Sequence, residues 1–183
     1  RLLCAGGTDV SVRHGAYTGE PTCAGAAAAA GGGKACAWGC LGLADCAVAC
    51  DYGAIHMDAS DLPVVDPDKC TACNDCVVAC PKDLFLVMPV TQKLIVQCKS
   101  LMEGDAAEAT CDVACTGCGK CAQDAAPGVI EITDGLAVVD YERNDAATEA
   151  AIERCPTGAI QWIDGAQFPL SQSKGPLQPT HTS

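Results

Sequence analysis

Large aromatic side chains and basic residues are scarce in this chain of 183 residues. Aromatic residues make up 4% of it, and 11 Lys and Arg stand against 23 Asp and Glu, for a formal net charge of −12. Much of the 49% hydrophobic content is Ala and Cys, so burial of large side chains cannot supply the folding energy alone. The acidic excess argues against nucleic acid and anionic membrane surfaces as direct partners and favours docking to basic patches on other proteins.

Long apolar runs and nucleotide-binding motifs are also missing. No run approaches the roughly 18–20 residues of a membrane span, and no secretory signal is visible. The stretch "GAAAAAGGGKA" has the lysine of a P-loop, but Ala28 and Ala35 stand where that loop needs Gly and then Ser or Thr. We interpret this stretch as a helix ended by a glycine run, and we expect no catalytic site in the chain.

Cysteine is the residue that is abundant, with 16 copies. That number leaves a disulfide framework or metal binding as explanations. The run "CTACNDCVVACPKD" (70–83) has the spacing C-x2-C-x2-C-x3-C-P of bacterial ferredoxins. Three thiolates two residues apart can hold three corners of an iron–sulfur cubane, and the proline stops the helix that carries the fourth. The run therefore predicts a [4Fe–4S] cluster, with structural zinc or disulfides as the alternative.

The cysteines repeat along the chain with an offset of 75 residues. "GAIHM" and "GVIEI" follow the same offset, and "LPVVD" answers "LAVVD" at 74, so the chain reads as a duplicated unit. Five cysteine pairs share the offset of 75: Cys23 and Cys98, Cys36 and Cys111, Cys40 and Cys115, Cys46 and Cys121, Cys80 and Cys155.

Ligand sets follow from the rule that the fourth cysteine of each run binds the neighbouring cluster. This rule predicts two complete sets and a third that has Leu43 in its middle position. A further set in the second unit is predicted to be lost, because its four positions are now Ala125, Asp145, Thr148 and Ala151. The two complete sets are Cys50, Cys70, Cys73, Cys76 and Cys115, Cys118, Cys121, Cys155, and the third has Cys40, Cys46 and Cys80.

Five cysteines remain, and one of them is needed at the site of Leu43 unless that site holds a three-cysteine cluster. Cys4, Cys23 and Cys36 are the candidates, and Cys4 is favoured because it has no counterpart in the repeat. The others would then form a fourth cluster at the junction of the two units: Cys23, Cys36, Cys98 and Cys111. The alternative is that some of them are buried thiols, so we predict three or four [4Fe–4S] clusters.

These motifs predict an α+β fold of two tandem bacterial-type 2[4Fe–4S] ferredoxin-like units, small, loop-rich and held together by their clusters. The first unit, with the N-terminal cysteines, is expected over 1–90, the second over 91–164, and a polar tail over 165–183. Short helices are predicted at 43–50, 74–80, 119–124 and 146–154. Strands are predicted at 54–57, 63–66, 84–88, 91–98, 129–132, 136–140 and 159–163.

The stretch from "KACAWGC" to "CPKDL" (34–84), followed by "IVQCKS", "CDVACTGCGKC" and "CPTGAI", resembles the B subunit of the Rnf complex, an ion-translocating ferredoxin:NAD oxidoreductase. The resemblance covers about residues 2–162. It implies that the cysteines of these runs bind iron in an electron-transfer subunit. Its partners would be other subunits of a redox complex and a soluble ferredoxin or similar low-potential donor.

The resemblance also implies a location. The chain is expected on the cytoplasmic side, where reducing conditions preserve thiolates, attached to the membrane through partner subunits. The family's membrane anchor and its first, four-cysteine domain are expected upstream of Arg1. Their absence from this sequence favours either a fragment or a polyferredoxin subunit of a different soluble redox enzyme.

Overall fold

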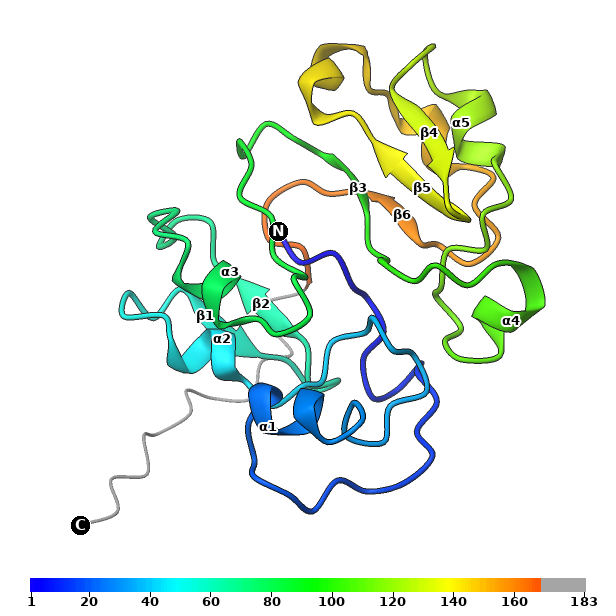
Figure 1. Ribbon diagram of the computed structural model, residues 1–183. Coiled ribbons are helices and arrows are strands. Elements are labelled where there is room, and N and C mark those ends of the chain that lie inside the picture. Colours follow the sequence, from blue (N-terminus) through cyan, green and yellow to red (C-terminus); the bar gives the residue numbers. More distant parts are fainter. Residues whose placement is uncertain (169–183) are drawn as a thin grey trace.

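A computed structural model describes residues 1–168. Short helices and short strands, several of them in consecutive pairs, are joined by loops (Figure 1). The α-helices are α1 Cys23–Ala28, α2 Asp45–Val48, α3 Asp75–Ala79, α4 Gly104–Glu108 and α5 Lys120–Asp124, and two 3₁₀ turns are η1 Tyr141–Ala146 and η2 Glu149–Ile152. The strands are β1 Ile55–Met57, β2 Pro63–Val65, β3 Leu94–Val96, β4 Ile130–Thr133, β5 Leu136–Val139 and β6 Ile160–Trp162. The mixed helix and strand content of a small molecule is confirmed.

The strands form three antiparallel pairs, β1 with β2, β4 with β5, and β3 with β6. In the hairpins Ile55 faces Val65 and Ile130 faces Val139, so equivalent positions of the predicted repeat have equivalent partners. The third pair joins segments far apart in the sequence, with Leu94 opposite Trp162. Two-stranded sheets of this length are not stable in isolation, so other contacts must hold the strands.

A second pairing of distant segments repeats the geometry of β3 and β6. Leu2 bridges Phe85, and the amide of Leu3 donates to the carbonyl of Leu84 at 2.7 Å. The amide of Gln97 donates to the carbonyl of Ala159 at the same distance. Residues 84 and 159 differ by 75, but residues 3 and 97 differ by 94, so the start of the chain is the structural counterpart of β3.

Three elements differ from the sequence prediction. The strand expected over 84–88 is reduced to the bridge at Phe85, and its backbone bonds to the first residues of the chain continue only to Leu86, which bonds with Arg1 in both directions. The helix expected over 146–154 is instead two 3₁₀ turns interrupted at Ala147, which is extended with φ −71° and ψ 138°. The helix α4, over "GDAAE", was not predicted.

The core is split into small clusters of side chains. The largest lies in the second half and contains Leu94, Val129, Ala151 and Ile160, and a second lies around Leu2 in the first half. Cysteines belong to both clusters. Within the described residues, no helix has the length and apolar character needed to cross a bilayer.

The first residues of the predicted tail contact the beginning of the chain. The side chain of Gln167 accepts from the amide of Leu2 at 2.9 Å and donates to its carbonyl, and Phe168 packs on the cluster around Leu2. The remainder of that tail, 169–183, lies outside the described residues.

Candidate metal centres

All sixteen cysteines lie within the described residues as free thiols, and they line four pockets with four cysteines each. We name the pockets by their position. The α3 site has Cys50, Cys70, Cys73 and Cys76, and the α5 site has Cys115, Cys118, Cys121 and Cys155. The α2 site has Cys23, Cys40, Cys46 and Cys80, and the junction site has Cys4, Cys36, Cys98 and Cys111. No cysteine is left over.

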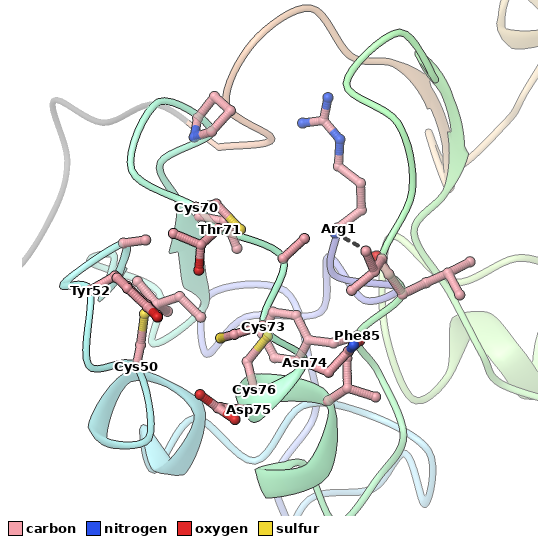
Figure 2. Close-up of a pocket in the computed structure, with 18 of the residues that line it drawn as sticks. Arg1, Cys50, Tyr52, Cys70, Thr71, Cys73, Asn74, Asp75, Cys76 and Phe85 are labelled. Carbon is pink, nitrogen blue, oxygen red and sulfur yellow. Dashed lines mark hydrogen bonds between the residues drawn. The ribbon is translucent and has the colours of Figure 1, made fainter.

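The α3 site is the most open of the four. Figure 2 shows its cysteines facing one another from the end of α2, from the loop that precedes α3 and from α3 itself. Cys70 and Cys73 are exposed, and the walls include Tyr52 and Phe85. Its sulfurs are therefore reachable from solvent while its floor is apolar.

The other three sites have nearly the same size. The space not filled by atoms, including the open mouth, is about 340 Å³ in the α5 and junction sites and about 350 Å³ in the α2 site. Their walls come from different segments of the chain, yet each pocket is lined by four cysteines and has nearly the same volume. Similar occupants would fit all three.

The grouping around Leu43 differs from the prediction that favoured Cys4. Cys23 lines the α2 site, whereas Cys4 lines the junction site with Cys36, Cys98 and Cys111. Cys23 is delivered by α1, whose amides at Cys23 and Ala24 donate to the carboxylate of Asp45 at 2.9 and 3.0 Å. Because Asp45 opens α2, this contact fixes the start of α1 beside the α2 site.

The offset of 75 between Cys23 and Cys98 is therefore a coincidence of numbering. Cys4 is the counterpart of Cys98, since both follow a segment that pairs with an equivalent carbonyl, Leu84 or Ala159. The amide of Ala5 donates to the carbonyl of Gln97 at 3.0 Å, which brings the two segments together. The local sequence gives little signal for this arrangement, because "LLC" (2–4) and "VQC" (96–98) share only the cysteine and an apolar residue two positions before it.

Three cysteine loops share one unusual backbone. The second and fourth residues after the first cysteine are left-handed in each: Gly42 and Ala44, Ala72 and Asn74, Gly117 and Gly119, with φ between 57° and 76°. The loop at Leu43 keeps this conformation although its middle cysteine is gone. It therefore retains the shape of a ligand loop.

The fourth loop has abandoned that shape. Ala147, two residues after the position of the missing first cysteine, has φ −71°, and Ala151 is 1% exposed in the core. Ala125, Ala147 and Ile152 pack against the core cluster that contains Ala151. Two of the four positions of the ligand set that the sequence predicts to be lost, Ala125 and Ala151, are thus part of the core packing.

Local contacts at the sulfurs fit a [4Fe–4S] cluster. Backbone amides donate to the sulfurs of Cys4, Cys80, Cys98 and Cys115 at 3.4 to 3.5 Å, and amide donors of this kind tune cluster potentials. A Cβ on Gly6 would lie 3.0 Å from the sulfur of Cys111, so glycine keeps the junction site open. In the described part of the chain, no three or more His, Cys, Asp or Glu are arranged to hold a single metal ion. The cysteines surround a volume instead of meeting at a point.

Burial dominates the electrostatics of these thiols. It raises the pKa of Cys40 to about 12, with the nearby Cys4 acting in the same direction, and it raises the pKa of Cys98 and Cys121 to about 11. Burial also raises the pKa of Cys46. Converting such thiols to thiolates requires compensating positive charge, which iron supplies when it binds.

Known proteins share both the motif and most of the chain. A family described as "4Fe-4S binding domain" matches residues 62–85. The B subunit of the Na(+)-translocating ferredoxin:NAD(+) oxidoreductase complex of Acetobacterium woodii is 35% identical over 87% of this chain and 47% of its own length. The B subunit of the proton-translocating ferredoxin:NAD(+) oxidoreductase complex of Clostridium ljungdahlii is 40% identical over 94% of this chain and 61% of its own length. The chain thus spans about half to three fifths of these two relatives.

A shorter relative is covered more fully. A Proteus vulgaris protein described as a probable iron–sulfur subunit of the Frd operon is 36% identical over 64% of this chain and 71% of its own length. The ferredoxin-type motif, the four pockets of four cysteines and these relatives all indicate an iron–sulfur protein. The chain belongs to the family of iron–sulfur proteins that includes the B subunits of the Rnf-type ferredoxin:NAD(+) oxidoreductase complexes.

Proposed function

We propose that this chain is an electron-relay subunit that binds four [4Fe–4S] clusters, one each at the α2, α3, α5 and junction sites. The observation that supports this most directly is the division of sixteen cysteines into four pockets of four. The clusters supply one-electron chemistry when bound. The chain's own residues hold them, limit their contact with water and set their potentials through amide donors and burial.

The tandem arrangement of two ferredoxin-like units, over 1–90 and 91–164, is part of this proposal. The matched hairpins β1–β2 and β4–β5 support it, as do the equal bonds at Leu84 and Ala159. In this arrangement the first unit holds the α2 and α3 sites, the second holds the α5 site, and the junction site joins them. A chain of sites through both units suits a relay.

The partners are proposed to be other subunits of a membrane-bound oxidoreductase complex, with the chain on the cytoplasmic side. The relatives in Acetobacterium and Clostridium are named as B subunits of ion-translocating ferredoxin:NAD(+) oxidoreductase complexes. These names support a low-potential ferredoxin or a similar carrier as the electron donor. The Proteus relative supports a second candidate, an iron–sulfur subunit of a different redox enzyme.

Iron and acid-labile sulfide per chain test the proposal. Anaerobically purified protein should contain about sixteen irons, because four cubanes carry four each. About twelve irons would reject one site, and colourless protein containing zinc would reject the whole proposal. A visible absorption band that bleaches on reduction is the accompanying expected result.

Single substitutions then test the assignment. Cys118→Ser and Cys98→Ser should each lower the iron content by about four per chain, since each removes one ligand from a different site. The double variant should lose about eight. If the double variant loses only as much as one single variant, the two cysteines serve one site and the assignment is wrong.

A further inference from the structure

Lys34 is the one buried Lys or Arg in the described part of the chain, with 7% of its surface exposed. Its ammonium donates to the carbonyl of Gly6 and to that of Cys40, the latter at 2.7 Å. None of the ion pairs among residues 1–168 involves it. A buried ammonium without a carboxylate partner is costly in a low-dielectric interior, which calls for a negative group nearby.

The surroundings of Lys34 are two cysteine sites. Lys34 lines the junction site, and one of its acceptors, Cys40, belongs to the α2 site. The other acceptor, the carbonyl of Gly6, also belongs to a residue that lines the junction site. The ammonium therefore lies between the two sites.

The backbone around Lys34 leaves room for its side chain. A Cβ on Gly39 would lie 2.8 Å from Cε and 3.4 Å from Nζ of Lys34, so the side chain passes directly over that glycine. The other acceptor residue, Gly6, would crowd the sulfur of Cys111 if it had a side chain. Two glycines thus permit the close approach of ammonium, carbonyls and sulfurs.

We propose that Lys34 sets the reduction potential of the junction site, and more weakly that of the α2 site, by stabilising the reduced cluster with its buried positive charge. The inference rests on the proposed function. A tetrathiolate cluster is anionic and becomes more so when it accepts an electron from a low-potential donor. A fixed positive charge in a medium of low dielectric therefore favours the reduced state, which makes the junction a preferred station for the electron between the two units.

Neutral and charged replacements distinguish this role from simple tethering of two carbonyls. Lys34→Gln keeps a hydrogen-bond donor but removes the charge, and Lys34→Arg keeps the charge. Lys99→Gln is the matched control, because Lys99 also lines the junction site and also donates to a carbonyl, that of Asp83 at 2.7 Å. Lys99 is only half-buried and that bond is open to solvent, so water screens its charge.

The readout is a redox titration of the anaerobic holoprotein, followed by electron paramagnetic resonance, after iron per chain has been measured. In Lys34→Gln with full iron, the oxidised-to-reduced ratio of one centre at its wild-type midpoint should rise at least tenfold, which is about 59 mV toward lower potential for one electron. Lys34→Arg should stay near wild type, and Lys99→Gln should shift less than Lys34→Gln.

A change below twofold in fully loaded Lys34→Gln would overturn the proposal. If Lys34→Gln loads incompletely, Lys34→Met is titrated in its place. Loss of about four irons from both neutral variants would also overturn it, by showing that the residue is needed for assembly and not for the potential. A colourless wild-type protein that contains zinc in place of iron would instead mean that the proposed function itself has failed, whatever the variants show.

Discussion

Gly6 and Gly117 show how single residues without side chains shape the cysteine sites. A Cβ on Gly6 would lie 3.0 Å from the sulfur of Cys111 and 3.7 Å from that of Cys4. Gly117 has φ +68°, and a Cβ there would lie 2.6 Å from the carbonyl oxygen of Gly135. The first glycine leaves room between sulfurs, and the second lets the α5 ligand loop approach the turn between β4 and β5.

Replacing Gly6 by alanine is therefore expected to damage the junction site alone. The added methyl group would push against the sulfur of Cys111, and a well-packed site tolerates such an addition poorly. Iron per chain should fall by about four, with the other three clusters retained. Iron analysis together with the electron paramagnetic resonance spectrum of the reduced protein measures this.

Gly15→Ala is the matched control, because Gly15 is exposed and a Cβ there would meet no atom within 4 Å. It should retain the full iron content. Equal iron in the Gly6 and Gly15 variants would contradict the role given to Gly6.

The backbone conformation of a cysteine loop indicates whether the loop still surrounds a ligand, even where a cysteine has been lost. Loop 40–46 and loop 145–151 have both lost ligands, yet only the first keeps left-handed residues, at Gly42 and Ala44. Ala44 is held there although a left-handed conformation costs an L-residue roughly 1–2 kcal/mol. That the loop keeps this strained conformation suggests that it still surrounds a ligand, whereas loop 145–151 has relaxed into 3₁₀ turns.

This difference predicts a rescue at the α2 site. Cys23→Ser should lose about four irons per chain. Adding Leu43→Cys should restore them, because the loop keeps the left-handed residues of the two complete ligand loops and Leu43 packs against the cluster that contains Cys23. The measurement is iron and acid-labile sulfide in the single and double variants. A double variant that stays at the iron content of the single variant would show that the loop no longer supports a ligand at 43.

The opposite result is expected in the second unit. Returning cysteine to positions 125, 145, 148 and 151 together should add no iron. The backbone there is extended at Ala147, and Ala151 is buried in the core cluster against which Ala125 and Ile152 pack, so neither the loop shape nor the space remains. A gain of about four irons in this quadruple variant would refute the claim that the site has been filled.

Much of the site could be predicted from spacing alone, and the exceptions have a physical cause. Three cysteines of the set with Cys70, and three of the set with Cys115, lie in one local run, in which sequence spacing fixes geometry within one loop and one helical turn. The fourth, Cys50 or Cys155, follows from the rule that the last cysteine of a run binds the neighbouring cluster. Cys4 and Cys23 were exchanged because each arrives through a pairing that spacing does not encode. One depends on the bridge from Leu2 to Phe85, and the other on amides bound by Asp45.

The elements show the same division. The hairpins were predicted within one or two residues because Val and Ile runs are bounded by Gly, Pro and Asp. The helix over 146–154 was wrong because "AATEAAIER" has good helical residues but is held by tertiary contacts. Arg154 binds Asp124 on α5 through two bonds of 2.7 Å, and Ala151 anchors η2 in the core.

At the scale of the whole molecule, the sulfurs take the place of a large core. Cys46 and Cys4 belong to the cluster around Leu2, and Cys115 and Cys121 belong to the largest cluster, around Leu94. The sheets have two strands each, and none of the α-helices in the described part exceeds six residues. Elements this short are marginal in water. Cluster ligation is therefore expected to provide most of the folding energy, as metal does in small metal-dependent domains.

Removing the iron tests this directly. Protein treated with a chelator under anaerobic conditions should lose its cooperative urea transition, and its two tryptophans should report the loss separately. Trp38 lines the junction site and Trp162 lies in β6 beside the largest cluster, so the first reports on the junction between the units and the second on the core of the second unit. Both should show red-shifted emission in the iron-free protein, because water reaches each ring once the sites open. Anaerobic reconstitution with ferrous iron and sulfide is the control, and it should restore the transition and both spectra.

Variants in which one of the two tryptophans is replaced by phenylalanine separate the two fluorescence signals. A sharp transition of iron-free protein at either tryptophan would show that the region around that tryptophan folds through its side chains alone. The clusters would then not be needed to stabilise that region.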